Sequence, residues 1–182
     1  MNISCLIRVR RMQEEDIEAV LEIESGLTGR RWTHQSFRES LQRPEAHFYI
    51  AETVSEPAGG SEDKSVTAES RGIKTGQICG YCCLYSILGE AEIVNVAVAP
   101  VKRKQGIGWQ MFRRVLDTEK QEGITMFVLE VRSSNFPAQR LYEKAGFTNC
   151  GIRRNFYENP VEDAVVMVKD TASDTDTDTV QR

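Results

Sequence analysis

The sequence predicts one domain of the mixed α/β class, spanning residues 1–170, with helices on both faces of a single sheet. Two observations carry this prediction. Short runs rich in valine, isoleucine and aromatic residues alternate along the chain with segments of helical periodicity. The chain also has 182 residues, of which 40% are hydrophobic and 27% charged, as is typical of a globular domain with one sizeable core.

The first half of the chain predicts three strands and two short helices. In chain order we expect a strand at 3–10, helices at 14–24 and 32–41, and strands at 47–52 and 77–88. The first helix presents apolar residues along one face, and in the second Thr33 is the expected N-cap. Its neighbours Trp32 and Phe37 are interpreted as core residues because large aromatic side chains are usually buried.

Two segments lack the apolar content that a packed structure needs. Residues 53–76 are rich in Ser, Glu, Gly and Lys and contain almost no large apolar side chain. The end of the chain, 171–182, is similarly polar, with three aspartates against one arginine. Because neither segment can bury enough surface to offset its conformational entropy, we predict a disordered insertion and a disordered acidic tail.

The segment 93–108 combines a strand, a basic turn and glycines. A run of Val, Ile and Ala ends at Pro100, the basic stretch 102–104 follows, and Gly106 and Gly108 lead into a helix over 109–120. Glycines allow close backbone approach, and the amides of a helix start point at an anion that the helix dipole favours. The pattern therefore indicates a phosphate-binding turn. It is neither a GxxxxGK[ST] loop nor a full GxGxxG motif.

A second strand and helix follow at residues 125–147. The strand alternates apolar residues with polar or smaller ones, which predicts two different faces. Ser134 or Asn135 can cap the helix, Pro137 fits its first turn, and Gly146 ends it. Two further strands are expected at 148–155 and 164–169.

Cysteine and histidine content argues against disulfides and metal. The five cysteines are odd in number and lack paired spacing, which predicts reduced core thiols. His34 and His47 are distant in sequence from any Cys or acidic cluster, so no metal site is expected. A net charge of −4 gives no basic field for nucleic acid, and the short apolar run at the start predicts neither a signal peptide nor a membrane span.

The glycine turn and the second strand–helix unit resemble one known family. Arg103, Gly106 and Gly108 resemble the acyl-CoA pyrophosphate loop of GNAT acetyltransferases. The pattern Leu-Glu-Val-Arg-x-Ser-Asn followed by Leu-Tyr-Glu-x-x-Gly-Phe is similar to the RimI-type branch, the ribosomal-protein alanine N-acetyltransferases. The resemblance covers roughly residues 8–169 apart from the insertion, and implies the GNAT fold with a mixed, mostly antiparallel sheet. It also implies that the segment from Trp32 to Phe37 matches a Trp-Ser/Thr-x-x-x-Phe motif near the acceptor groove, and Arg31 departs from the proline that the branch has before it.

The resemblance also implies the roles of particular residues. Glu130 corresponds to the general base that takes the proton of the attacking amine, and Tyr142 to the acid that protonates the leaving thiolate. Partial burial of Glu130 is expected to raise its pKa toward neutrality. The strand backbone, the turn and one asparagine correspond to groups that bind acetyl-CoA: Val96, Ala97, Val98, Arg103, Lys104, Gln105, Gly106, Ile107, Gly108, Trp109 and Asn135. Without the resemblance, Glu130 reads as an exposed strand residue and Tyr142 as a core aromatic.

The expected function is therefore acetyl-CoA-dependent N-acetyltransfer, without a metal, to the N-terminal α-amine of a protein. Neutralising an α-amine at pH 7 costs ~1 to 1.4 kcal/mol, against ~4.6 kcal/mol for a lysine side chain, so one modest base suits the α-amine better. The resemblance implies a small-subunit ribosomal protein as partner in the cytoplasm, with no direct nucleic-acid or membrane contact. Two alternatives stay open: acetylation of lysine or a small metabolite amine, and a regulatory acyl-CoA-binding module without turnover.

Overall fold

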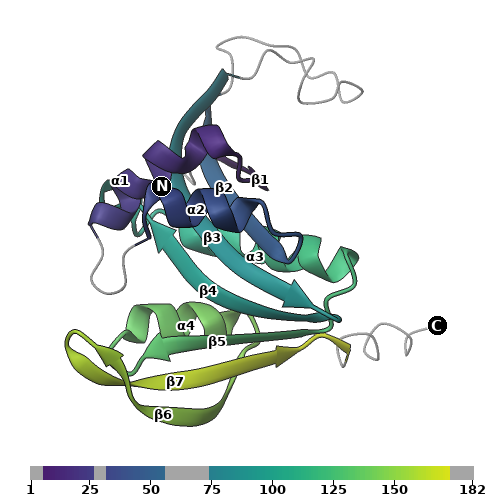
Figure 1. Ribbon diagram of the computed structural model, residues 1–182, viewed down its shortest axis with the longest axis vertical. Coiled ribbons are helices and arrows are strands. Elements are labelled where there is room, and N and C mark those ends of the chain that lie inside the picture. The colour runs from purple at the N-terminus through teal and green to yellow at the C-terminus, as the bar shows by residue number, and fades with distance from the viewer. Residues whose placement is uncertain (1–5, 27–31, 56–73, 173–182) are drawn as a thin grey trace.

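The computed structural model describes residues 6–26, 32–55 and 74–172. Seven strands form one sheet in the order β1-β2-β3-β4-β5-β7-β6 (Figure 1). β4 and β5 pair in parallel, whereas every other neighbouring pair is antiparallel. The strands are β1 (Ile7–Arg11), β2 (Ala46–Ser55), β3 (Lys74–Ile87), β4 (Glu90–Val98), β5 (Met126–Arg132), β6 (Thr148–Glu158) and β7 (Val161–Asp170).

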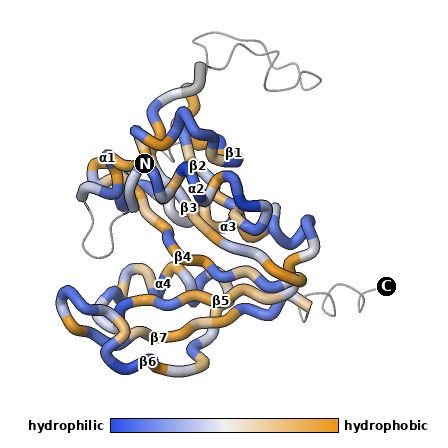
Figure 2. The backbone as a smooth tube through the Cα atoms, viewed as in Figure 1, coloured by the Kyte–Doolittle hydropathy of each residue, from blue (hydrophilic) through white to orange (hydrophobic). Residues whose placement is uncertain are grey.

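Four helices cover the two faces of this sheet, as the sequence predicts. They are α1 (Ile17–Ser25), α2 (His34–Leu41), α3 (Ile107–Gln121) and α4 (Phe136–Lys144). Two separate clusters of buried side chains show the division: α1 and α2 pack on one face of the central strands, and α3 packs on the other together with Tyr142 of α4. Figure 2 shows apolar residues along the central strands and along the middle of β7, whereas polar residues gather on β6 and at the β6–β7 turn.

The predicted helix signals act as expected. Thr33 caps α2 by accepting a hydrogen bond from the amide of Ser36 at 3.1 Å. Phe37 is fully buried and stacks on Trp32 with a ring separation of 4.7 Å, which confirms both as residues of the apolar core around α2. After α4, Gly146 adopts a φ of 90°, a left-handed conformation that favours glycine and ends the helix.

The predicted boundaries of the insertion and the tail are wrong at their edges. β2 continues to Ser55 and β3 begins at Lys74, so residues 53–55 and 74–76 belong to the hairpin because each strand supplies the other's backbone partners. The remaining 56–73 lie outside the described residues. Thr171 is only 5% exposed and donates its hydroxyl to the carbonyl of Ile124 at 3.2 Å, so it belongs to the domain. Residues 173–182 also lie outside the described part.

Shortening the chain should therefore preserve the domain if the cuts respect these pairings. The Cα atoms of Ser55 and Lys74 are cross-strand partners, so a two-residue Asn-Gly turn can replace 56–73. We expect this variant, ended after Ala172, to keep its melting temperature within a few degrees and its turnover with a peptide acceptor. A stable variant that loses turnover would show that the removed residues take part in acceptor binding. A matched variant ended after Asp170 should melt lower because it loses Thr171.

The cysteines divide between core and surface. Cys79, Cys82 and Cys83 are buried thiols of the core, as predicted, whereas Cys150 is exposed, which corrects its assignment to the core. The reason is local. In the β6–β7 pairing the register passes from Asn149 to Gly151, so Cys150 is an extra residue in the edge strand and its side chain is left at the surface. Cys5 lies outside the described residues.

Candidate active site

The central feature of the candidate site is the point where β4 and β5 part. Their pairing ends at Ile93 and Leu129, whereas β4 continues to Val98 paired only with β3. A bulge lies directly after this point, because Leu84 of β3 pairs with Ile93 and the preceding β3 residue, Cys83, pairs with Asn95, which leaves Val94 as an extra residue. Bulges bend a strand and increase its twist. The predicted cofactor-binding backbone of 96–98 therefore runs along a stretch of β4 that β5 does not pair.

The glycine turn leads directly from β4 into α3. Lys104 and Gly106 both have left-handed backbone conformations, with φ of 60° and 79°. Gly106 is the N-cap of α3 and, having no side chain, supplies no cap hydrogen bond to the first-turn amides. A Cβ at Gly108 would lie 3.5 Å from the Val98 side chain, an ordinary contact. This geometry fits an anion at the start of α3, as the sequence predicts.

The side chains around the turn stabilise it rather than extend from it. The Arg103 Nε donates to the carbonyl of Val98 at 3.0 Å, and the Gln105 amide donates to the carbonyl of Val101 at 3.3 Å. Trp109 lies under the Lys144 ammonium, 4.3 Å from the ring centre, which ties the start of α3 to the end of α4. The predicted cofactor role of the turn is therefore best served by its backbone amides.

Glu130 lies one residue beyond the last β5 residue that pairs with β4. Its strand neighbours Leu129 and Val131 are buried against α3, so by alternation Glu130 faces the opposite side of the sheet. Its side chain is 16% exposed and accepts a hydrogen bond from Arg153 of β6 at 2.6 Å. The charged partner therefore comes from β6, across the intervening strand β7, which the local sequence around Glu130 does not indicate.

Tyr142 lies on the other face, in the core beneath α3. It is 8% exposed, and its ring centre lies 5.3 Å from that of Phe112 and 6.1 Å from that of Phe147. Burial raises the pKa of Tyr142, so the phenol stays protonated at neutral pH. The core-aromatic interpretation of this residue is thus confirmed, and its role as acid stays a prediction. Glu130 and Tyr142 approach the parting strands from opposite sides of the sheet.

The start of α4 is fixed by two polar side chains. Asn135, rather than Ser134, caps the helix by accepting from the amide of Ala138 at 3.3 Å. This contact uses the side-chain oxygen of Asn135, so its predicted contact with the cofactor would be made by the side-chain NH2 group. Glu162 of β7 accepts from the Ser134 amide at 2.6 Å and from Arg132 at 3.0 Å, and these contacts lower the pKa of Glu162 to about 2.

Sequence analysis missed a buried polar cluster beside the site. Glu24, near the end of α1, is 4% exposed and accepts hydrogen bonds from the hydroxyl of Tyr81 on β3 and from the amide of Asn95 on β4, the latter at 2.8 Å. Burial, followed by the hydrogen bond to Glu24, raises the pKa of Tyr81, so its hydroxyl remains a donor. No local motif could have found the cluster because its members come from three separate elements.

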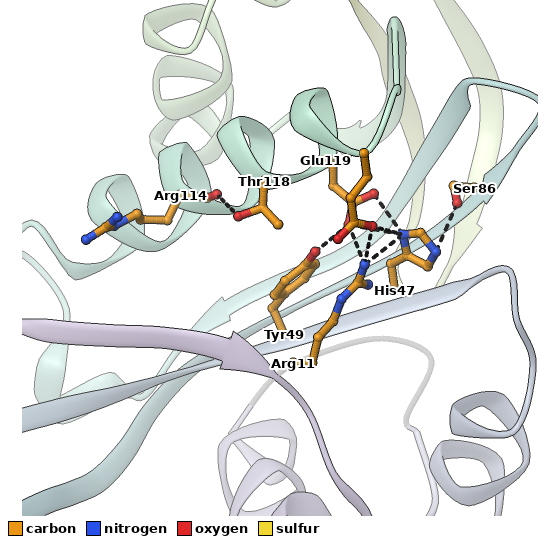
Figure 3. A network of polar contacts seen from close by, with 8 residues as sticks. Arg11, His47, Tyr49, Ser86, Arg114, Thr118 and Glu119 are labelled. Carbon is orange, nitrogen blue, oxygen red and sulfur yellow. Dashed lines mark hydrogen bonds and ion pairs between the residues drawn. The ribbon is translucent and has the colours of Figure 1, made fainter. Parts of the chain in front are cut away.

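A second polar network lies at the far end of α3, between that helix, β1 and β2 (Figure 3). Glu119 is fully buried and accepts from Tyr49 at 2.5 Å and contacts His47 at 2.8 Å. Sequence distance had placed His47 far from acidic residues, which the fold corrects. Arg11 enters the same cluster at 3.4 Å from Glu119, so the buried negative charge already has a positive partner within the chain.

Comparison with known proteins agrees with this geometry. The model of the Acetyltransferase (GNAT) family matches residues 17–147. The chain belongs to the GNAT family. It is therefore an N-acetyltransferase, and its co-substrate is acetyl-CoA, which suits the open first turn of α3 and the unpaired stretch of β4.

Relatives within the GNAT family place the chain near one branch. A Bacillus subtilis (strain 168) protein, named provisionally as a ribosomal protein bS18-alanine N-acetyltransferase, is 36% identical over 160 residues, which are 87% of this chain and 92% of that protein. The Escherichia coli (strain K12) ribosomal protein bS18-alanine N-acetyltransferase is 35% identical over 96 residues, which are 52% of this chain and 65%, just under two thirds, of its own length.

Solved structures show the same GNAT fold. The crystal structure of the ribosomal-protein-S18-alanine N-acetyltransferase from Escherichia coli aligns with a TM-score of 0.72 at 24% identity, covering 91% of this chain and 94% of that chain. A NatC complex bound to Gag peptide and CoA aligns with a TM-score of 0.67 at 19% identity, covering 90% and 98%. Among the described residues, no helix is both long and apolar enough to cross a membrane.

Proposed function

We propose that this chain acetylates the N-terminal α-amine of a protein, with the N-terminal alanine of a ribosomal protein of the bS18 type as its acceptor. The observation that carries this proposal is the similarity to the Bacillus subtilis relative, which extends over 87% of the chain at 36% identity. Ribosomal proteins and acetyl-CoA meet in the cytoplasm, so the proposal includes that location.

Binding of the co-substrate falls to the backbone in this proposal. The amides of Gly106, Ile107 and Gly108 would hold the pyrophosphate of acetyl-CoA at the start of α3, where the helix dipole favours negative charge. The stretch of β4 over 96–98 would pair with the pantetheine arm, because β5 has already parted from it. One of its amides would polarise the thioester carbonyl as the amine attacks.

The chemical step needs one group to accept a proton and another to donate one. The neutral amine attacks the thioester carbonyl carbon, a C–N bond forms, and the tetrahedral intermediate then breaks its C–S bond. In our proposal Glu130 accepts the proton that the amine loses, directly or through one water, and Tyr142 donates a proton to the departing thiolate. The two side chains lie on opposite faces of β5, so a thioester held between the parting strands is accessible to both.

Arg153 has a specific place in this mechanism. Its guanidinium lies 2.6 Å from the Glu130 carboxylate and fixes the position of that group. A single carboxylate base matches an α-amine, whose deprotonation at pH 7 costs only ~1 to 1.4 kcal/mol, better than a lysine side chain at ~4.6 kcal/mol.

The acceptor can be tested by intact-mass measurement. We expect a peptide with the N-terminal sequence of bS18 from the source organism to gain one acetyl group after incubation with enzyme and acetyl-CoA. The same peptide with a blocked α-amine and a free lysine side chain is the control, and should gain none. Acetylation of the blocked peptide alone would contradict the α-amine assignment and favour a lysine acetyltransferase.

A further inference from the structure

The buried carboxylates of the described chain differ in their partners. Asp16 binds Arg10 at 2.7 Å, and Glu52 lies 3.5 Å from the same guanidinium. Glu119 lies 3.4 Å from Arg11. A buried carboxylate is costly unless a positive group and hydrogen bonds compensate for lost hydration. The fold itself supplies that positive group to these three residues.

Glu24 is the exception among the buried acidic residues that the structure describes. Within that part of the chain its hydrogen-bond donors are neutral: the Tyr81 hydroxyl and the Asn95 amide, which both approach Oε1, and the Trp32 amide at 3.5 Å from Oε2. The last distance is at the limit of a hydrogen bond, so Oε2 retains capacity to accept. A carboxylate that is 4% exposed and held by neutral donors suits a positively charged ligand.

The Glu24 carboxylate lies close to the point where β4 and β5 part, so a ligand bound to it would lie beside the candidate active site. Asn95 lies two residues beyond Ile93, where β4 leaves β5, and Glu130 lies one residue beyond the corresponding point on β5. The Asn95 side chain turns toward α1, and Glu130 also faces away from α3. Both therefore border the parting strands on the same face. Asn95 is partly exposed, so the polar cluster reaches the surface where an acceptor would enter.

We propose that Glu24 binds the α-ammonium group of the acceptor. This inference rests on the proposed acetylation of a protein N-terminus. At pH 7 an α-amine with an ordinary pKa of ~7.7 to 8.0 arrives mostly protonated, so a site that holds it needs a negative charge. Tyr81 and Asn95 hold the Glu24 carboxylate in place, and Glu130 accepts the proton when the amine reacts. Glu24 is thus a specificity residue for a charged N-terminus.

The test compares two ligands that differ only in charge at the N-terminus. One is an acceptor peptide that begins with alanine, and the other is its analogue with a hydroxyl in place of the α-amine. Titration calorimetry on CoA-saturated enzyme at pH 7 should show about 10- to 100-fold tighter binding of the amine peptide, the range of a hydrogen bond to a charged group. Glu24→Gln should lose this preference and bind the hydroxyl analogue as the wild type does.

A matched control separates recognition from folding. Glu119→Gln removes a carboxylate that is equally buried but already paired with Arg11, so it should lower the melting temperature and keep the amine preference. If Glu24→Gln does not fold, Glu24→Asp keeps the charge but withdraws it by one methylene, and the preference should shrink without vanishing. A wild type without the preference, or a Glu24→Gln enzyme that keeps it, overturns the proposal.

Two further outcomes have distinct meanings. Equal weakening of both ligands in Glu24→Gln would assign the carboxylate to structure and would overturn the inference. Acetylation of the amine peptide by the wild type is measured separately and reports on the proposed function alone. An enzyme that prefers the amine peptide but does not acetylate it would refute that function while supporting the role of Glu24.

Discussion

Replacing Glu130 with Gln is expected to lower kcat by about 10²- to 10⁴-fold at pH 7, the usual contribution of general-base catalysis. Glutamine has a similar size but cannot accept the amine proton. The fold should persist, because the pair that is lost joins a 16% exposed carboxylate to a 57% exposed Arg153 and contributes only about 0 to 1 kcal/mol. Affinity for CoA should also persist, since the cofactor turn lies on the opposite side of the sheet from this carboxylate.

The pH dependence provides the decisive readout. As pH rises toward 9, more of the acceptor amine arrives neutral, so the defect of Glu130→Gln should shrink. Tyr142→Phe should lower kcat without this recovery, because alkali does not help to protonate a leaving thiolate. Both variants should be measured where chemistry limits the rate. Normal turnover of Glu130→Gln at pH 7 would assign the carboxylate to structure or acceptor binding, with solvent taking the proton.

The parts of the fold that sequence analysis predicted correctly depend on local signals. Thr33, Pro100 and Gly146 mark element ends through their own backbone or side-chain chemistry, and each acts as expected in the structure. The alternation in β5 also predicted a strand with two different faces, and Phe127 and Leu129 are buried on one of them. Such signals depend only on residues that are neighbours in sequence, so they hold regardless of the tertiary arrangement.

The parts that sequence analysis missed depend on contacts between distant segments. Glu24 is held by hydrogen bonds from Tyr81 and Asn95, which lie on two strands far along the chain. His47 meets Glu119 only because α3 crosses β2 in space. Thr171 reads as part of a polar tail, yet its hydroxyl bonds to a carbonyl 47 residues earlier. Hydrophobic patterning carries no information on such pairings.

The candidate site shows the same limit. The family resemblance singled out Glu130 and the glycine turn, but no residue type signals where β4 and β5 part or the bulge at Val94 beside that point. No local signal singles out Arg153, although its guanidinium meets Glu130 across the intervening strand β7. The sequence therefore predicted which chemical groups take part, and the structure adds which groups influence one another.

Gly108→Asp should abolish measurable CoA binding without unfolding the protein. A Cβ at this position makes an ordinary contact with Val98 at 3.5 Å, so the backbone can accept a side chain. A carboxylate in the first turn of α3 also interacts favourably with the helix dipole, which favours unchanged or slightly raised stability. The same carboxylate would occupy the place of the pyrophosphate and repel it, so the two effects have opposite signs.

Gly108→Ala is the matched control because it adds the Cβ without the charge. Calorimetric titration with CoA should show affinity near that of the wild type for Gly108→Ala and loss of at least about 100-fold for Gly108→Asp, more than one charged hydrogen bond supplies. Thermal unfolding of the three proteins should give similar midpoints. If Gly108→Asp binds CoA normally, the pyrophosphate does not lie at the start of α3, and the basic stretch before the turn would need to hold it elsewhere. Equal losses in both variants would instead attribute the effect to the added volume beside Val98.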